Sequence, residues 1–115
     1  MKTRVLVSKV AGVTYEGRQA HLARLTGREP LRIEPEPRNP YDPNALAVKV
    51  AIDGEVLHCG YIPKDLAKQI APLLSGENVM VSSFEITGGF ETYDGDTAAL
   101  GMLLRVEIPV EDGEV

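Results

Sequence analysis

The sequence predicts a single small domain whose mainly antiparallel β-sheet closes or half-closes into a barrel. Three observations indicate this fold: short segments alternate apolar and polar residues, short turns join them, and only one segment has a clear helical pattern. A chain of 115 residues fits one domain with one core. We expect the domain to span residues 1–108 and to be followed by a frayed acidic tail at 109–115.

The first half is predicted to contain a strand, a short helix and an edge strand. Residues 3–10 alternate valines with polar neighbours, as a strand does. Loosely spaced alanines and leucines between residues 15 and 27 predict a short helix. Residues 31–33 predict a short strand, which Pro35 and Pro37 follow. Because proline has no backbone N–H to donate, this strand is expected at an edge of the sheet.

The middle of the chain contains the clearest hairpin and the clearest helix. Residues 46–52 place their apolar side chains on one side of a strand, and Asp53-Gly54 is a tight-turn signal before a second strand at 55–62. From Pro63 onward the apolar residues are spaced as on one helix face, up to a stop at Ser75-Gly76. Within this helix, Pro72 is expected to bend the last turn.

Two further strands are predicted near residues 78–86 and 99–108, and the second has five apolar residues of one parity. Between them, the segment TGGFETYDGD is expected to form a mobile loop that exposes two aromatic side chains.

The charge is unevenly distributed along the chain. The net charge is -5, yet residues 1–49 carry nine Lys or Arg and five Asp or Glu, and the remainder carries three basic and twelve acidic residues. An anion-binding face made mainly by the first half fits this asymmetry, because steering depends on the local field rather than on net charge. Scattered, solvated side chains explain it equally well.

Catalysis, metal binding and membrane insertion find little support. Phosphate-binding, dinucleotide-binding and serine-hydrolase motifs are absent, and no paired carboxylates or Ser-His-Asp set stands out. Cys59 is the only cysteine, and the adjacent His58 points to the opposite face of its strand, so we interpret Cys59 as buried and His58 as half-exposed. We expect a soluble, cytoplasmic binding protein without a metal ion or cofactor, and no membrane partner.

Three segments in order, VAGVTY, EPEPRNPYDPNALAVKV and GYIPKDLAKQIAPLL, resemble a HIRAN domain over roughly residues 4–106. That family is a modified OB-like β-barrel, found at the N-terminus of certain Swi/Snf-type fork-remodelling ATPases and as short stand-alone bacterial proteins. Its best understood members capture the 3' end of single-stranded DNA. The resemblance implies that end as the ligand, with a DNA-remodelling ATPase as a candidate protein partner.

The resemblance also implies a role for particular residues. Tyr15 and Tyr41 match the positions of stacking aromatics, and base stacking contributes about 1–3 kcal/mol per base. Asp42 matches a carboxylate that accepts a hydrogen bond from the 3' hydroxyl, and such a carboxylate would repel a 3' phosphate. Asn39 matches a residue of the pocket, where its side chain holds the loop or contacts the nucleotide.

Four other positions concern the phosphates and a late-loop aromatic. Tyr61 and Lys64 match residues that contact backbone phosphates at the start of the helix. Thr14 stands where the best understood members have a basic residue, so phosphate affinity is expected to be lower. Phe90 aligns loosely with an additional stacking aromatic of the late loop.

Alternatives to DNA binding stay open at this point. A purely structural loop explains the turn formers of residues 39–44 as well as a site does; they are Asn39, Pro40, Asp42, Pro43 and Asn44. Tyr15 fits core packing as well as stacking, and Tyr41 fits burial under the barrel. A lysine such as Lys64 is more often a solvated helix residue than a phosphate ligand. For the whole domain, a protein-interaction or targeting module on the same barrel is the main alternative, and an enzyme acting at a DNA end is a third.

Overall fold

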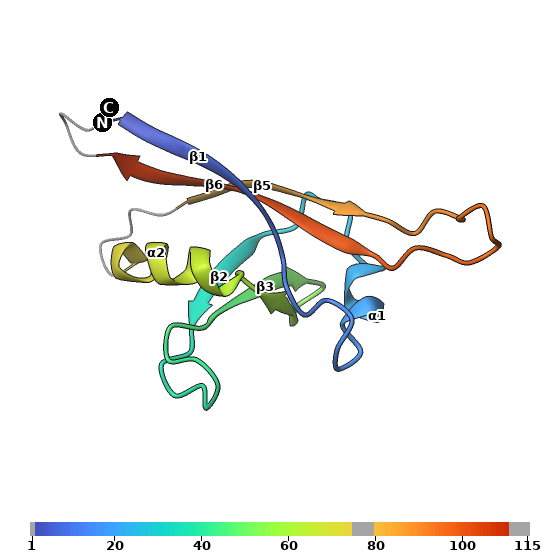
Figure 1. The fold of residues 1–115 in the computed structure, drawn as a ribbon, viewed down its shortest axis with the longest axis horizontal. Coiled ribbons are helices and arrows are strands. Elements are labelled where there is room, and N and C mark those ends of the chain that lie inside the picture. The colour runs from blue at the N-terminus through green and yellow to red at the C-terminus, as the bar shows by residue number, and fades with distance from the viewer. Residues whose placement is uncertain (1, 75–79, 111–115) are drawn as a thin grey trace.

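The structure, a computed structural model, describes residues 2–74 and 80–110 (Figure 1). The mainly β class predicted from the sequence is confirmed. In chain order the elements are β1 (Lys2–Lys9), α1 (Arg18–Leu22), β2 (Leu31–Pro35), β3 (Leu46–Ile52), β4 (Glu55–Tyr61), α2 (Lys64–Leu74), β5 (Met80–Thr87) and β6 (Gly101–Val110).

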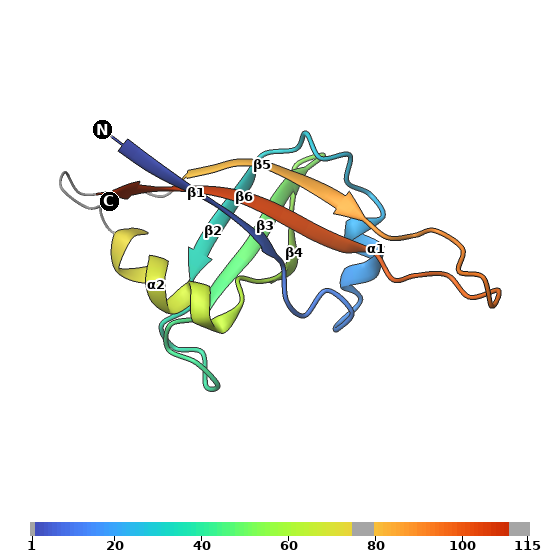
Figure 2. The ribbon, with the colours of Figure 1, turned by 45° about the horizontal axis from the view of Figure 1, so that its top comes forward.

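The strands form two antiparallel sheets of three strands each, in the orders β1-β6-β5 and β2-β3-β4. Figure 2 shows the strands of the first sheet crossing over those of the second. The core lies between the sheets because each turns one face inward. In β3, Leu46, Val48 and Val50 are buried, and in β6 every even-numbered residue from Met102 to Ile108 is buried. Burying one such side chain stabilises the fold by about 1.5–3 kcal/mol.

The barrel is not closed. β1 pairs with β6 over its whole length, and then the chain turns away at Gly12, whose φ is 74°. Among the described residues just after β1, Ala11 forms an isolated bridge to the other sheet, with Tyr61. We call the place where Ala11 and Tyr61 pair the seam between the two sheets. Two backbone hydrogen bonds, of 2.8 and 2.9 Å, join the two residues there. The predicted closure is therefore partial, because the chain leaves β1 before a continuous ladder to β4 can form.

Most of the predicted elements are confirmed, with shifted limits. The turn between β3 and β4 has positive φ at Asp53 and Gly54, as a tight hairpin requires. Pro35 ends β2 at the edge of its sheet, as expected. β6 reaches Val110, two residues beyond its predicted end, whereas residues 111–115 lie outside the described residues.

Three details differ from the sequence prediction or fall outside it. α1 is short, as predicted, but it ends at Leu22 rather than near Gly27; it begins only at Arg18 because Glu16 and Gly17 have left-handed backbone conformations. The valines that predicted β1 lie on its exposed face, and Leu6 packs against the core instead. α2 is confirmed as far as Leu74, with Pro72 in its last turn, and its predicted stop at 75–76 lies outside the described residues.

The segment between β5 and β6 extends as an arm away from both sheets (Figure 1). A bridge between Glu91 and Thr97 joins its two sides. Phe90 and Tyr93 are exposed on it, as predicted. Neither helix of the described residues is long and apolar enough to cross a membrane.

Candidate functional site

An open cleft of about 1420 Å³ lies beside the seam between the two sheets. Its walls come from three segments: residues 11–18 from the end of β1 to the start of α1, residues 36–45 between β2 and β3, and residues 61–64 from the end of β4 to the start of α2. The cleft brings together the following residues predicted from the sequence: Tyr15, Asn39, Tyr41, Asp42, Tyr61 and Lys64. The structure does not bring in the other two, since Thr14 does not line the cleft and Phe90 lies on the arm.

Two tyrosine rings are exposed in this cleft. Tyr41 has 92% of its surface exposed and Tyr15 has 68%. Core packing was an open alternative for Tyr15, and burial under the barrel was one for Tyr41; both are wrong. Each ring therefore has a face available to a ligand.

The loop that carries Tyr41 is fixed by side-chain hydrogen bonds rather than by burial. Asn39 Oδ1 accepts hydrogen bonds from the backbone N–H groups of Tyr41 (2.9 Å) and Asp42 (3.2 Å). Asp42 Oδ1 accepts from the N–H of Asn44 at 2.8 Å. Side chains of Asn and Asp stabilise turns in this way. Asn39 thus holds the loop, and within the described residues Asp42 Oδ2 has no hydrogen-bond donor.

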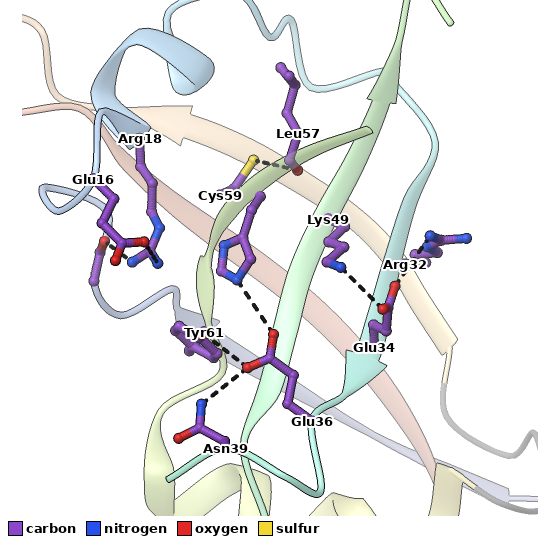
Figure 3. A network of polar contacts seen from close by, with 12 residues as sticks. Glu16, Arg18, Arg32, Glu34, Glu36, Asn39, Lys49, Leu57, Cys59 and Tyr61 are labelled. Atoms are coloured by element: carbon purple, nitrogen blue, oxygen red, sulfur yellow. Dashed lines mark hydrogen bonds and ion pairs between the residues drawn. The ribbon is translucent and has the colours of Figure 1, made fainter. Parts of the chain in front are cut away.

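Glu36 connects this loop to β4, a role that the sequence analysis missed. Its Oε1 accepts hydrogen bonds from Asn39 Nδ2 (3.1 Å) and from the Tyr61 hydroxyl (3.0 Å), as Figure 3 shows. Burial raises the pKa of Tyr61, and the hydrogen bond to Glu36 and its charge raise it further, so the hydroxyl stays protonated and continues to donate. Glu36 lies three residues before Asn39, the spacing of the first and last residues of a turn, and this spacing was the sequence signal that could have indicated their contact.

Arg18 is the second residue that the sequence analysis missed. It lines the cleft, although only 8% of its side chain is exposed. Its Nη1 donates to the carbonyl oxygen of Gly12 at 2.8 Å, and its Nη2 donates to Glu16 Oε2 at 3.0 Å. The guanidinium lies 5.4 Å from the centre of the Tyr61 ring, within the range of a cation–π contact. No sequence signal indicates this burial, because arginine is mostly exposed.

The ionisable groups of the cleft are balanced in formal charge. Arg18, Arg38 and Lys64 face three carboxylates, those of Glu16, Glu36 and Asp42. Lys64 is exposed at the first residue of α2. Across the described part of the chain, neither Arg38 nor Lys64 forms an ion pair, so both charges are available to an anion.

His58 lies behind Tyr61, with the two rings edge to face and their centres 4.9 Å apart. Both of its ring nitrogens are buried without a hydrogen-bond partner among the described residues, and Nε2 lies 3.8 Å from Glu36 Oε2. Burial lowers the pKa of His58 from its usual 6.5, and the charge of Arg18 lowers it further, whereas Glu36 opposes the shift. Cys59 is buried, as predicted, and burial raises its pKa to about 11.

The lowered pKa of His58 predicts a loss of stability on acidification. Between this pKa and 6.5 the unfolded chain binds more protons than the folded chain, so stability falls as the pH drops through this window. Urea unfolding should give a lower midpoint at pH 5.5 than at pH 7.5, and His58→Gln should reduce the difference. His21 is present in both proteins and cancels in the comparison. An unchanged difference in His58→Gln would contradict this prediction.

This chain is similar to a solved structure, that of the HIRAN domain of human HLTF, with 24% identity and a TM-score of 0.49, over 88% of this chain and 74% of the other. No curated protein matches the chain. The sequence model of the HIRAN domain family matches residues 4–105, nearly the whole chain. The chain therefore belongs to the HIRAN domain family.

Proposed function

We propose that this HIRAN domain binds single-stranded DNA at a free 3'-hydroxyl end, in the cleft beside the seam. HIRAN domains are in general nucleic-acid-binding modules. The observation that carries the proposal is one cleft lined both by two exposed tyrosines and by a carboxylate, that of Asp42, with one oxygen left to accept a hydrogen bond.

Stacking supplies the affinity in this proposal. Tyr15 and Tyr41 reach the cleft from separate segments, each with an exposed ring. Stacking on an aromatic ring tolerates any base, because every base has a π-face. The loop of Tyr41 is already fixed by Asn39, so little conformational entropy is lost when a base stacks on it. The proposal therefore predicts binding with weak base preference.

Asp42 supplies the preference for a free end. Its Oδ1 is engaged by the N–H of Asn44, which orients the carboxylate and leaves Oδ2 to accept a hydrogen bond. A 3' hydroxyl donates such a bond, whereas a 3' phosphate has no suitable donor at neutral pH and repels the carboxylate. Arg38 and Lys64 on the cleft wall are the candidate contacts for backbone phosphates.

Fluorescence anisotropy with short labelled oligonucleotides tests the proposal. The wild-type domain should bind a 3'-hydroxyl end about tenfold or more tightly than a 3'-phosphate end, since a hydrogen bond to a charged group contributes about 1.5–3 kcal/mol. Asp42→Asn should bring this ratio close to one, because it removes the charge while keeping the acceptor for Asn44. Affinity should fall with salt, at a slope of about -0.7 per phosphate contacted.

Asp96→Asn is the matched control, because it makes the same change of charge at an exposed residue of the arm. It should leave the preference for the 3' hydroxyl intact. Equal affinity of the wild-type domain for both ends, or no binding at low salt, would refute the proposal.

A protein-interaction or targeting module is the second candidate function. The balanced charges of the cleft favour it, since many nucleic-acid interfaces are strongly basic. A DNA-remodelling ATPase is the proposed kind of partner. Pull-down after nuclease treatment separates the two functions: partners lost with the nuclease count against direct protein binding.

A further inference from the structure

We propose that Arg18 is a phosphate-binding residue of the cleft, and that the Glu16 carboxylate takes the place of the phosphate in the ligand-free protein. The inference rests on the proposed function in one respect: it assigns Arg18 to a backbone phosphate of the bound strand. The phosphate site itself is testable without DNA.

Arg18 has the features of a preorganised anion site. One edge of its guanidinium is held by the carbonyl oxygen of Gly12, and its plane lies near the ring of Tyr61. Glycine at position 12 leaves room for this arrangement, because a Cβ there would lie 2.9 Å from Arg18 Nη1. A buried arginine requires a partner for its charge. The carbonyl oxygen and the ring carry no full negative charge, so the charged partner must contact the remaining edge.

Glu16 is that partner in the ligand-free protein, and it is readily displaced. Its carboxylate accepts from Arg18 Nη2 at 3.0 Å, yet 81% of its side chain is exposed. Water reaches the Glu16 end of this pair and screens its attraction to Arg18, which weakens the pair. The backbone at Glu16 has a φ of 53°, a left-handed conformation that is unfavourable for a residue with a Cβ. The exposed Glu16 carboxylate is thus accessible to a competing anion.

A phosphate fits the same edge of Arg18. Carboxylates and phosphates both present two oxygens to a guanidinium, in paired and charge-assisted hydrogen bonds. Arg18, Glu16 and the proposed stacking residue Tyr15 line the same cleft, and Tyr15 immediately precedes Glu16. When a backbone phosphate binds, the Glu16 side chain moves into solvent and the phosphate becomes the partner of Arg18.

Glu16→Gln tests this exchange because it removes the competing charge and keeps the size of the side chain. We expect it to bind a 3'-hydroxyl oligonucleotide about two- to fivefold more tightly at low salt, a modest gain because water already screens the Glu16 end of the pair. Glu85→Gln is the control, since it makes the same change of charge at an exposed residue of β5, outside the cleft. Equal gains in the two variants would overturn the proposal.

A second readout follows the Arg18 side chain itself. In ¹H–¹⁵N spectra, inorganic phosphate should shift the Arg18 Nε–H signal, and at lower concentrations in Glu16→Gln than in the wild-type domain. A signal that phosphate moves in neither protein would overturn the proposal, even if oligonucleotides bind. A shift with phosphate together with no oligonucleotide binding would support the phosphate site and refute the proposed function. Neither readout depends on an Arg18 variant that fails to fold.

Discussion

Replacing Gly60 with alanine is expected to lower the free energy of unfolding by about 2–5 kcal/mol. Gly60 lies in β4 at the seam, with a φ of 150°, a conformation that side chains rarely adopt. A Cβ there would overlap the carbonyl oxygen of Ala11 and lie 2.7 Å from Val10 Cγ1. Because two backbone hydrogen bonds join Ala11 to Tyr61, Ala11 cannot move away from the added Cβ without breaking them. Urea unfolding followed by circular dichroism measures the loss.

Gly54→Ala separates steric overlap from backbone strain. Gly54 has a φ of 80° in the hairpin turn, and a Cβ there meets nothing within 4 Å. It should lose only the strain of a left-handed residue, about 1–2 kcal/mol. Equal losses for Gly54→Ala and Gly60→Ala would show that the seam adjusts to the extra atom and would contradict the prediction.

Replacing Tyr41 with alanine is expected to weaken binding of single-stranded DNA by about 5- to 150-fold, the equivalent of one stacked base at about 1–3 kcal/mol. Stability should change by less than about 0.5 kcal/mol, because the ring is 92% exposed and lies outside the core. Anisotropy gives the first quantity and urea unfolding gives the second.

Tyr93→Ala provides the matched control for Tyr41. Tyr93 is also a fully exposed tyrosine, but it lies on the arm and does not line the cleft. Its removal should leave DNA affinity unchanged. An equal loss of affinity in both variants would mean that exposed tyrosines contribute wherever they lie, and the cleft would no longer be the binding site.

Alternation along the sequence predicted the strands well, because it reflects which residues of a strand are buried. In β3 and β6 most of the predicted inward residues are buried, although Ile52 and, just before β6, Leu100 are only half-buried and Ala47, on the other side of β3, is buried as well. Alternation does not say where a strand leaves its sheet. That point depends on the turn at Gly12, so the sequence left open whether the barrel closes or half-closes, and the structure has it unclosed. In β1 it also favoured the wrong face, since Val5 and Val7 are exposed.

The candidate site was predictable where local chemistry defines it. The turn residues around Tyr41 and Asp42 indicated a fixed loop, and Asn39 and Asp42 do fix it. Glu36 and Arg18 were missed because charged residues are usually solvated. Each contacts Tyr61, Glu36 by a hydrogen bond and Arg18 by its guanidinium over the ring. Tyr61 is 25 residues from Glu36 and even further from Arg18 in the sequence. Such contacts arise only once β4 has been placed.

At the seam, backbone hydrogen bonds between Ala11 and Tyr61 join the two sheets, in addition to the core that packs between them. The amide protons of Ala11 and Tyr61 are each held by the other residue's carbonyl oxygen, and both residues line the cleft. A ligand in the cleft would contact both sheets at once and favour the closed seam by its binding free energy. Ligand binding in the cleft would then reduce the fraction of molecules that are locally unfolded at its edge. The hydrogen exchange of these two amides would record that fraction.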